Sequence, residues 1–327
     1  MKKIWLIIAT LMIFIFTPPA YSQVEEAAIE ACIAVRSRTA DKDITLAELR
    51  LQCQKITHSA IGRRVAFEKA ALSNPFSVLP HKPNYVLPIT YFNANEQPYV
   101  NRPQRYKLDD LEAKFQFSVK YIAAEDFLTK GLDLEIAFTT TSWWQSYNSK
   151  ISSPFRETNY EPELILSYKK NWSFIGAKVA YSSFSFSHQS NGQTGELSRS
   201  WNRIAGKVAF VHNDFIWNLR AWWRLPEKDK NNLGDPDGDD NPNIERYMGY
   251  AELGAIWRLP DRHNVDLLLR NNLRSNNKGS IKLGWSFPFS KHLRWYVEYF
   301  SGYGESLIYF DQNTSRIGFG VKLTDWL

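Results

Sequence analysis

The chain has 327 residues, a formal net charge of +6 and 15% aromatic residues, among them 12 tryptophans and 16 tyrosines. The charge is mild and no basic tract stands out, so nothing predicts a nucleic-acid partner, while a small positive excess would suit an anionic surface. Beyond the first residues, no stretch approaches the ~20 apolar residues of a membrane-spanning helix, which excludes a helical membrane protein.

The first residues have the pattern of an export signal. Lys2 and Lys3 precede an apolar run from Ile4 to Phe16, and Ala20-Tyr21-Ser22 places small residues at the −3 and −1 positions of a cleavage site. The run is too short to span a bilayer as a mature helix. We therefore expect residues 1–22 to be a signal peptide.

Residues 23–73 are expected to form a short, helical periplasmic extension. Val24–Arg36 and Leu46–Lys55 have the composition of short helices. Thr45 and Glu48 have capping-box spacing at the start of the second one.

The chain has two cysteines, Cys32 and Cys53, and both precede the strand-rich region. In an oxidising periplasm this predicts a disulfide between them. The alternatives are a pair of buried thiols or a mobile leader.

From about Asn84 onward, the hydrophobic period changes from helical to two. In 111–121 and 132–138, apolar residues alternate with charged and polar ones, as in half-buried strands. The pattern predicts strands near 84–93, 111–121, 132–143, 160–168, 172–190, 200–211, 215–224, 246–258, 263–273, 279–288, 291–309 and 314–326.

The connections between these strands alternate in length. The tight joins are Lys169–Asn171, His212–Asp214, Asp261–Arg262 and Phe289–Ser290, and the longer joins lie near 94–110, 144–159, 191–199, 225–245 and 274–278. Membrane barrels combine short periplasmic turns with long external loops, whereas a soluble β-sandwich has no reason to alternate them. The aromatic content fits the girdles of such a barrel, although a sugar-binding β-protein could share it. We expect an all-β fold, a twelve-stranded antiparallel transmembrane β-barrel over residues 74–327.

One predicted hairpin carries three polar residues on its lipid-facing side. Phe184, Phe186, His188 and Ser190 share one parity, and Asn202 shares the parity of apolar residues on the return strand. Apolar residues face out of a membrane barrel, so the polar three are expected to contact lipid. Polar groups there are costly, which adds weight to a functional interpretation against a structural one.

The register of this hairpin brings the three residues together. A turn centred near Gly195 pairs residues whose numbers sum to 390, so that His188 lies opposite Asn202 and Ser190 opposite Ser200. Directly opposed side chains have Cβ atoms ~5 Å apart. Asn202 can then hold one imidazole nitrogen while Ser190 approaches the other, which is the nucleophile, base and orienter of acyl transfer.

Several motifs carry a resemblance to a known family. His188-Gln189-Ser190-Asn191-Gly192, together with Ser198-Arg199-Ser200-Trp201-Asn202-Arg203, resembles the signature of bacterial outer-membrane phospholipase A. The segments Ser152–Pro162, after Ser142–Gln145, and Tyr303–Ile308 are similar too. The resemblance runs from about Asn74 to the C-terminus and leaves both cysteines outside it.

The resemblance implies an activity and an environment. The family hydrolyses acyl esters of phospholipids and lysophospholipids in the Gram-negative outer membrane, with its site toward the outer leaflet, and is active as a calcium-bound homodimer. By position, Ser190 matches the nucleophile, His188 the base and Asn202 the orienting residue. The backbone amides of Ser190 and Gly192 correspond to the oxyanion hole.

The calcium contacts of the family also map onto this sequence. They fall on the backbone carbonyl of Gln193, the hydroxyl of Ser198 and the carbonyl of the partner subunit's Ser152. Two positions depart from the family pattern. Gly195 stands where members carry an acidic residue, which bears on a second Ca²⁺ site, and Thr140 replaces a glutamine that supports the dimer contact.

Other interpretations of the sequence stay open. A lipopolysaccharide deacylase uses a similar His-Ser pair, and a non-enzymatic porin would make the outer polar residues incidental. Asp235–Asn241 lacks the glycine and glutamate of the helix–loop–helix calcium pattern, so we expect a solvated external loop there. Trp143-Trp144 and Trp222-Trp223 are expected in the interfacial girdle.

Overall fold

The structure is a computed structural model. It describes residues 21–324 except 39, 41–42, 59, 73, 75, 94–106, 170–171, 175–176, 213, 231, 233–234, 236–237 and 291–292. The chain divides into two compact units, Met1–His58 with Gly62–Ala70 and Ser59–Ile61 with Ala71–Leu327. The predicted signal peptide lies outside the described residues, except for Tyr21 and Ser22, which begin the first helix.

The N-terminal unit is helical, as expected. Its helices are α2 (Tyr21–Arg36) and α3 (Leu46–Thr57), followed by α4 (Ala60–Ala71), which the sequence pattern did not predict. Thr45 caps α3 through a complete capping box with Glu48. Of the helices among the described residues, none is long and apolar enough to cross a membrane.

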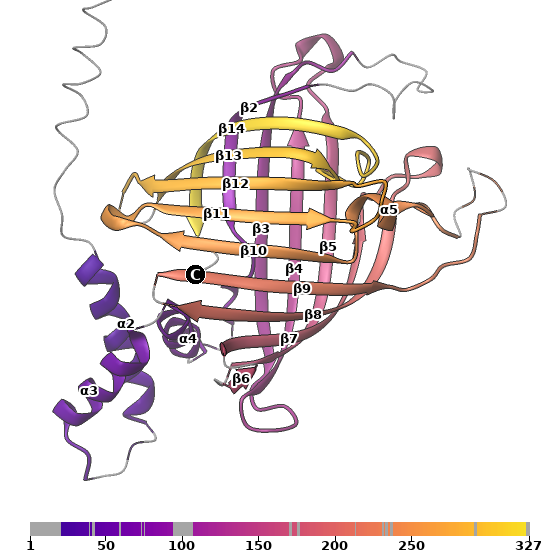
Figure 1. Cartoon of the computed structure of the whole chain (residues 1–327). Coiled ribbons are helices and arrows are strands. Elements are labelled where there is room, and N and C mark those ends of the chain that lie inside the picture. The colour runs from indigo at the N-terminus through magenta and orange to yellow at the C-terminus, as the bar shows by residue number, and fades with distance from the viewer. Residues whose placement is uncertain are drawn as a thin grey trace, which may run out of the picture. The chain divides into compact units, whose positions relative to one another are not determined.

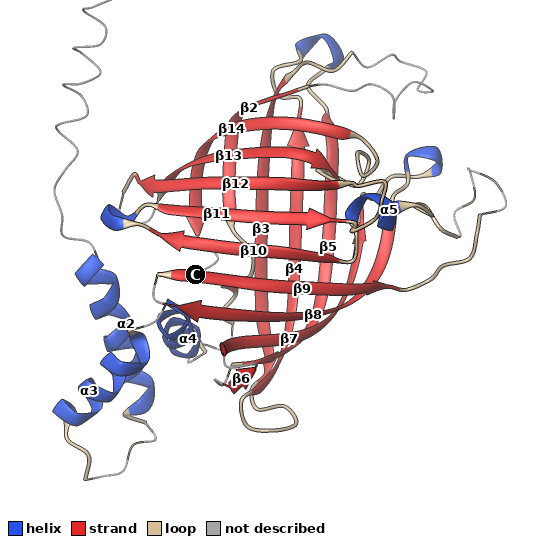
Figure 2. Ribbon diagram, in the orientation of Figure 1, coloured by secondary structure: helices blue, strands red, loops and turns tan. Residues whose placement is uncertain are grey.

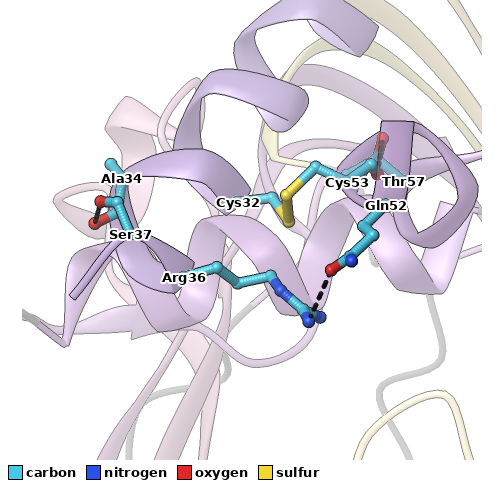
Figure 3. Close-up of a disulfide and its surroundings, with 7 residues drawn as sticks. All are labelled: Cys32, Ala34, Arg36, Ser37, Gln52, Cys53 and Thr57. Carbon is cyan, nitrogen blue, oxygen red and sulfur yellow. Dashed lines mark hydrogen bonds between the residues drawn. A yellow bond between two sulfur atoms is a disulfide. The ribbon is translucent and has the colours of Figure 1, made fainter. Parts of the chain in front are cut away.

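A disulfide joins the two predicted helices. Cys32 of α2 and Cys53 of α3 are bonded, which confirms the prediction (Figure 3). Both are buried with Ile29 and Ala66 in a small apolar core. The Arg36 guanidinium donates to the side chain of Gln52 at 3.0 Å beside the bridge.

The second unit is a closed antiparallel barrel (Figures 1 and 2). Twelve strands form its wall, β2–β5 and β7–β14, and β2 pairs with both β3 and β14 to close it. Short β1 adds to β3 and short β6 adds to β7. The bounds are β1 (Leu79–Pro80), β2 (Asn84–Phe92), β3 (Leu111–Ala124), β4 (Leu132–Trp144), β5 (Phe155–Tyr168), β6 (Trp172–Phe174), β7 (Ala177–Ser190), β8 (Ser200–His212), β9 (Phe215–Arg224), β10 (Ala251–Arg258), β11 (Asn264–Asn271), β12 (Gly279–Pro288), β13 (Arg294–Tyr303) and β14 (Asn313–Thr324).

Two expected strand boundaries on β5 and β7 were wrong. β5 begins at Phe155 rather than near residue 160. The turn expected at Lys169–Asn171 is also wrong, because β6 pairs antiparallel with β7, with Trp172 opposite Val179. The polar run at 169–171 has the composition of a turn, but strand pairing continues past it, and the chain reverses between β6 and β7.

Two other expected strands are shorter than their apolar patterns. The segment near 246–258 begins as helix α5 (Ile244–Met248), which ends at Gly249 with φ +67°, and only Ala251–Arg258 is strand. The segment near 291–309 ends as a strand at Tyr303. There Gly304 has φ +72°, a left-handed conformation that interrupts the extended backbone.

The two faces of the barrel wall have opposite polarity. Outward positions expose apolar side chains, including Ile89, Phe117, Val119, Ile136, Phe138, Leu164, Phe184, Leu219, Trp223, Leu253, Leu283, Ile317 and Phe319. Inward positions bury charged ones, including Glu112, Lys114, Lys120, Glu135, Arg156, Glu161, Glu163, Arg203, Glu298, Arg316 and Lys322. An apolar outside and a polar inside are the marks of a barrel that spans a membrane.

The connections alternate as predicted. Short turns join β6 to β7, β8 to β9, β10 to β11 and β12 to β13 at one end, and the longer loops occupy the other. The β3–β4 connection, residues 125–131, is at the short-turn end but is long for a turn. The long loops are 93–110, 145–154, 191–199, 225–250, 272–278 and 304–312. Helix α5 lies at this long-loop end, at the right of Figure 1.

Residues 304–312 fold across the interior at the long-loop end. The Leu307 amide donates to Asn159 Oδ1 at 2.9 Å, and the Ile308 amide donates to Glu157 Oε1 at 3.1 Å, both on β5. Leu307 and Phe310 also pack with Trp201, Trp222, Ile244 and Met248. Apolar side chains from β8, β9, α5 and residues 304–312 therefore pack together at this end of the barrel.

Candidate active site

The β7–β8 hairpin has the predicted register. His188 lies opposite Asn202, and Ser190 lies opposite Ser200. Phe184 and Phe186, which share their face, are 56% and 44% exposed, whereas Ser185 and Ser187 are buried. The three candidate catalytic residues therefore lie on the outward, apolar face.

The structure brings His188 and Asn202 into contact. His188 Nδ1 lies 2.9 Å from Asn202 Oδ1, and an amide oxygen only accepts, so the Nδ1 hydrogen is the donor. That tautomer leaves the Nε2 lone pair free for a proton. Ser190 lies two residues along the same face, and its hydroxyl makes no hydrogen bond to His188 among the described residues. Such bonds often tighten only when substrate binds.

The loop after Ser190 is organised by one buried side chain. Asn191 is 2% exposed; its Oδ1 accepts from the Arg199 amide at 3.0 Å and from the Gln193 amide at 3.2 Å. Its Nδ2 donates to the Leu197 carbonyl at 2.8 Å. These bonds hold the 191–199 loop closed beside the candidate nucleophile.

Gly192 has a conformation that favours glycine. Its φ is +63°, and a Cβ there would lie 3.3 Å from Cε2 of Tyr160. Tyr160 of β5 pairs with Ser190 of β7, so its ring lies next to the candidate nucleophile. A side chain at position 192 would therefore require the Tyr160 ring to shift by a few tenths of an ångström.

Thr140 lies on the same outward face. It pairs with Tyr160, which in turn pairs with Ser190, so Thr140 is two strands from the candidate nucleophile. Tyr160 also stacks on Phe138, with ring centroids 6.4 Å apart.

Two acidic residues near the site were missed by sequence reasoning. Asn202 Nδ2 donates to Glu227 Oε1 at 3.1 Å, and Asp240 Oδ2 accepts from the hydroxyls of Ser198 and Ser200 at 2.8 and 3.0 Å. Both belong to the 225–250 loop. The order of the strands could have found them. Since β8 pairs with both β7 and β9, the 191–199 loop before β8 and the 225–250 loop after β9 are neighbours.

The candidate metal ligands lie in two loops. Ser198 follows the turn Gly195–Leu197, and Ser152 is left-handed at φ 61° after the turn Ser149–Ile151. Gly195, the first residue of that turn, contributes no side chain to the loop. Among the described residues, no group of three or more His, Cys, Asp and Glu side chains could hold a metal.

Asp240 is an anionic oxygen donor beside Ser198. Burial acts to raise its pKa, but hydrogen bonds from Lys230, Ser198 and Ser200 outweigh it, and its pKa is below the ordinary value. The Lys230 ammonium lies 2.5 Å from Asp240 Oδ1. The site therefore already accommodates a positive charge.

The expectation of a fully solvated Asp235–Asn241 loop was wrong for its second half. Asp239 pairs with Arg224, and Asn241, which is fully buried, donates to the Ser200 carbonyl at 2.7 Å. This part packs against β8 and β9 because their buried polar groups need partners. Residues 236–237 lie outside the described residues.

The tryptophan pairs divide between the two faces of the wall. Trp144 and Trp223 are exposed on the outside, as a girdle requires, but Trp143 and Trp222 are buried inside. Successive strand residues point to opposite faces, so only one member of each pair can face lipid. The girdle prediction was wrong for the other member.

Comparison with known proteins places the chain in a family. It matches the sequence model of the Phospholipase A1 family over residues 61–323. Phospholipase A1 of Escherichia coli (strain K12) is 34% identical over 253 residues, which cover 77% of this chain and 83% of the relative. Outer membrane phospholipase A from Escherichia coli superimposes with a TM-score of 0.71 at 33% identity, covering 78% of this chain and 94% of that one. The Salmonella typhi outer membrane phospholipase, solved as a dimer with bound calcium, gives the same TM-score and identity over 78% of this chain and 95% of its own. The chain belongs to the phospholipase A1 family.

Proposed function

We propose that the protein is a calcium-dependent phospholipase of the Gram-negative outer membrane that hydrolyses acyl esters of phospholipids and lysophospholipids. Ser190 is the nucleophile, His188 the general base and Asn202 the orienting residue. The observation that carries this assignment is the 2.9 Å contact between His188 Nδ1 and Asn202 Oδ1, on a lipid-facing stripe shared with Ser190.

The triad performs acyl transfer in two steps. Ser190 Oγ attacks the ester carbonyl while His188 Nε2 takes its proton, and the same proton then goes to the departing alcohol of the lysolipid. Water, deprotonated by His188, hydrolyses the acyl-serine to release the fatty acid and restore Ser190. The backbone amides of Ser190 and Gly192 donate to the oxyanion that develops in each step.

The placement of the triad suits a lipid substrate. The residues are half-buried on the outward face near the long-loop end, between exposed Phe186 and the polar 191–199 loop. An acyl chain would lie along the apolar wall while its ester group reaches the polar residues. Because long loops are external, this is the outer-leaflet end.

We propose one Ca²⁺ site beside the triad. The donors are the Gln193 carbonyl, the Ser198 hydroxyl and the carbonyl of the partner subunit's Ser152, and Asp240 adds a carboxylate. All are oxygen ligands, which calcium prefers. When bound, the ion supplies positive charge near the oxyanion.

The active form is proposed to be a homodimer formed through the outward face. The Salmonella typhi relative was solved as a dimer with calcium. The outward face of this chain between Thr140 and Ser190 carries exposed Phe138 and Tyr160, which a second copy would cover.

The porin alternative fits the interior poorly. Among the described residues, Glu112 pairs with Arg156 and Arg316 at 2.9 and 2.7 Å, Lys114 pairs with Glu298 at 2.6 Å, and residues 304–312 cross the long-loop end. These contacts fill the space that a pore would need. Lipopolysaccharide deacylation has no observation of its own in its favour.

We also propose that residues 1–22 are removed as a signal peptide, that 23–73 form a periplasmic extension, and that 74–327 form the barrel. The disulfide between Cys32 and Cys53 supports export to an oxidising compartment.

One assay tests the proposed function. Purified protein in detergent with Ca²⁺ should release fatty acid from diacyl phospholipid, and a sulfonyl fluoride with a long alkyl chain should modify Ser190 and stop the release. Ser190→Ala should be inactive with an unchanged heat-dependent shift on a detergent gel. Full turnover by a correctly folded Ser190→Ala would refute the assignment.

A further inference from the structure

Glu227 lies next to Asn202 although the two belong to different segments. The β8–β9 register pairs Arg203 with Arg224, and the Leu225 amide donates to the Asn202 carbonyl at 2.9 Å, so the pairing continues one residue past β9. Glu227 is two residues further, with the same parity as Leu225. Diagonal neighbours of this kind are within reach of long side chains.

The contact settles the orientation of the Asn202 amide. An ionised carboxylate has no hydrogen to donate, so Glu227 Oε1, at 3.1 Å, can only receive the Nδ2 hydrogen. Asn202 Oδ1 must then face His188 Nδ1, which must carry its hydrogen, and the Nε2 lone pair is left for Ser190. A flipped amide would direct hydrogen toward Nδ1 and favour the opposite tautomer, which cannot accept the serine proton.

We propose that Glu227 is a positioning residue of this enzyme. It holds the orientation of the Asn202 amide and, through that amide, places negative charge near His188. The proposal rests on the triad proposed above. Asparagine is neutral and stabilises an imidazolium less than a carboxylate would. A charged acceptor on Nδ2 polarises the amide and makes Oδ1 a stronger acceptor from His188.

The charges around Glu227 are compatible with this role. Burial raises the pKa of Glu227, and Asp239 and Asp240 act in the same direction, while the bond from Asn202 and the charge of Arg224 act to lower it. The Asn202 amide therefore favours the ionised form that accepts its hydrogen.

The arrangement also explains why an aspartate would fit badly at position 202. A carboxylate there would face Glu227 directly, and two carboxylates in contact cannot both be ionised, so they would share a proton. With glutamine at position 227, the aspartate introduced by Asn202→Asp would instead receive a hydrogen bond from the glutamine amide. The effects of substitutions at positions 202 and 227 on activity should therefore be coupled. Glutamine at position 227 should raise the activity of Asn202→Asp, which a merely structural Glu227 would not predict.

The test measures kcat and KM for phospholipid hydrolysis by the full-length protein in mixed micelles at saturating Ca²⁺. The variants are Glu227→Ala, Glu227→Gln, Asn202→Asp and the double variant Asn202→Asp/Glu227→Gln. Asp229→Asn, which removes a charge from an exposed position of the same loop, is the matched control. Ser190→Ala gives the background rate.

Glu227→Ala should lower kcat roughly tenfold with little change in KM. This loss is at the lower end of the free energy of a hydrogen bond to a charged group, because the site is partly exposed. Glu227→Gln should lose less, since its amide oxygen still accepts from Nδ2, and Asp229→Asn should match the unaltered protein. The double variant should be more active than Asn202→Asp alone. Unchanged kcat in Glu227→Ala, or a double variant no better than Asn202→Asp, would overturn the proposal. Activity in Ser190→Ala would instead overturn the triad itself.

Discussion

A Cβ added to Gly192, two residues past the end of β7, would lie 3.3 Å from Cε2 of Tyr160 on β5, which is tighter than an ordinary van der Waals contact. Gly192 also has φ +63°, where a side chain is strained. The neighbouring ring and the left-handed backbone both restrict which residue can stand at position 192, next to Ser190. The amide proposed as an oxyanion donor therefore belongs to a backbone conformation that favours glycine.

Gly192→Ala should therefore lower kcat by roughly 100-fold, as expected when one oxyanion donor is displaced. Gly195→Ala is the matched control, because Gly195 has φ +64° but no heavy atom within 4 Å of its added Cβ. It carries the same backbone strain without the contact. Equal losses in the two variants would show that strain, and not the position of the amide, explains the effect.

Asn202→Ala should cost less activity than His188→Ala. In the proposed mechanism His188 transfers the proton in both steps, so its loss should lower kcat by about 10⁴-fold, at the upper end of acid–base contributions. The orienting residue acts only through the imidazole, and water can partly replace it. Turnover rates with one phospholipid at one pH decide the order, and a larger loss in Asn202→Ala would contradict the assigned roles.

The period-two pattern predicted the barrel and the register of the catalytic hairpin. His188 opposite Asn202 followed from one turn position, because strand pairing repeats the same relation along the whole hairpin. The disulfide between Cys32 and Cys53 and the cap at Thr45 are likewise set by local chemistry.

The long loops could not be predicted in the same way. The 225–250 loop that carries Glu227 and Asp240 is held by contacts that depend on the folded barrel, among them those of Arg224 with Asp239 and the Asn241 carbonyl. Residues 305–310 carry an apolar pattern that continues the strand, yet they fold across the interior. Long-range packing, and not local period, decides both.

The segment across the interior should give the barrel a defined acid sensitivity. Burial would raise the pKa of Glu305, but the charge of Arg316, and then those of Lys114 and Arg156, lower it from 4.5 to about 2. Because the folded pKa is depressed, this stabilisation is present above about pH 4.5 and is lost as the pH falls through about 2. The contribution is on the order of 3 kcal/mol at neutral pH.

Glu305→Gln should accordingly unfold at lower denaturant concentration at pH 7 and show a flatter pH dependence between pH 4.5 and 2. Heat-modified migration or tryptophan fluorescence of the protein in detergent reports the midpoint. Glu125→Gln, in an exposed turn at the other end, is the control for removing one charge. An unchanged slope in Glu305→Gln would place the acid-sensitive group elsewhere.

Calcium binding and dimerisation should rise together in this protein. In the proposed site, Gln193 and Ser198 offer too few oxygens for an ion that takes six to eight ligands, so Asp240, waters and the partner subunit's Ser152 would complete the shell. A ligand shared between subunits couples the two equilibria by linkage. Ser198→Ala should therefore weaken both calcium affinity and the dimer fraction, while Ser275→Ala, in an exposed loop at the same end, should change neither.

Lys230 should weaken calcium binding, whereas Ser198 should strengthen it. Its ammonium lies 2.5 Å from Asp240 Oδ1, where it would compete with Ca²⁺ in the proposed site for the carboxylate. Lys230→Met should raise calcium affinity several-fold, because removing a competing positive charge within contact distance favours a divalent ion. Titration calorimetry for calcium and analytical ultracentrifugation in detergent, with calcium or chelator, measure the two equilibria without reference to activity. If Ser198→Ala binds calcium normally, or if chelated protein keeps its dimer fraction, the shared site is wrong while the triad stands.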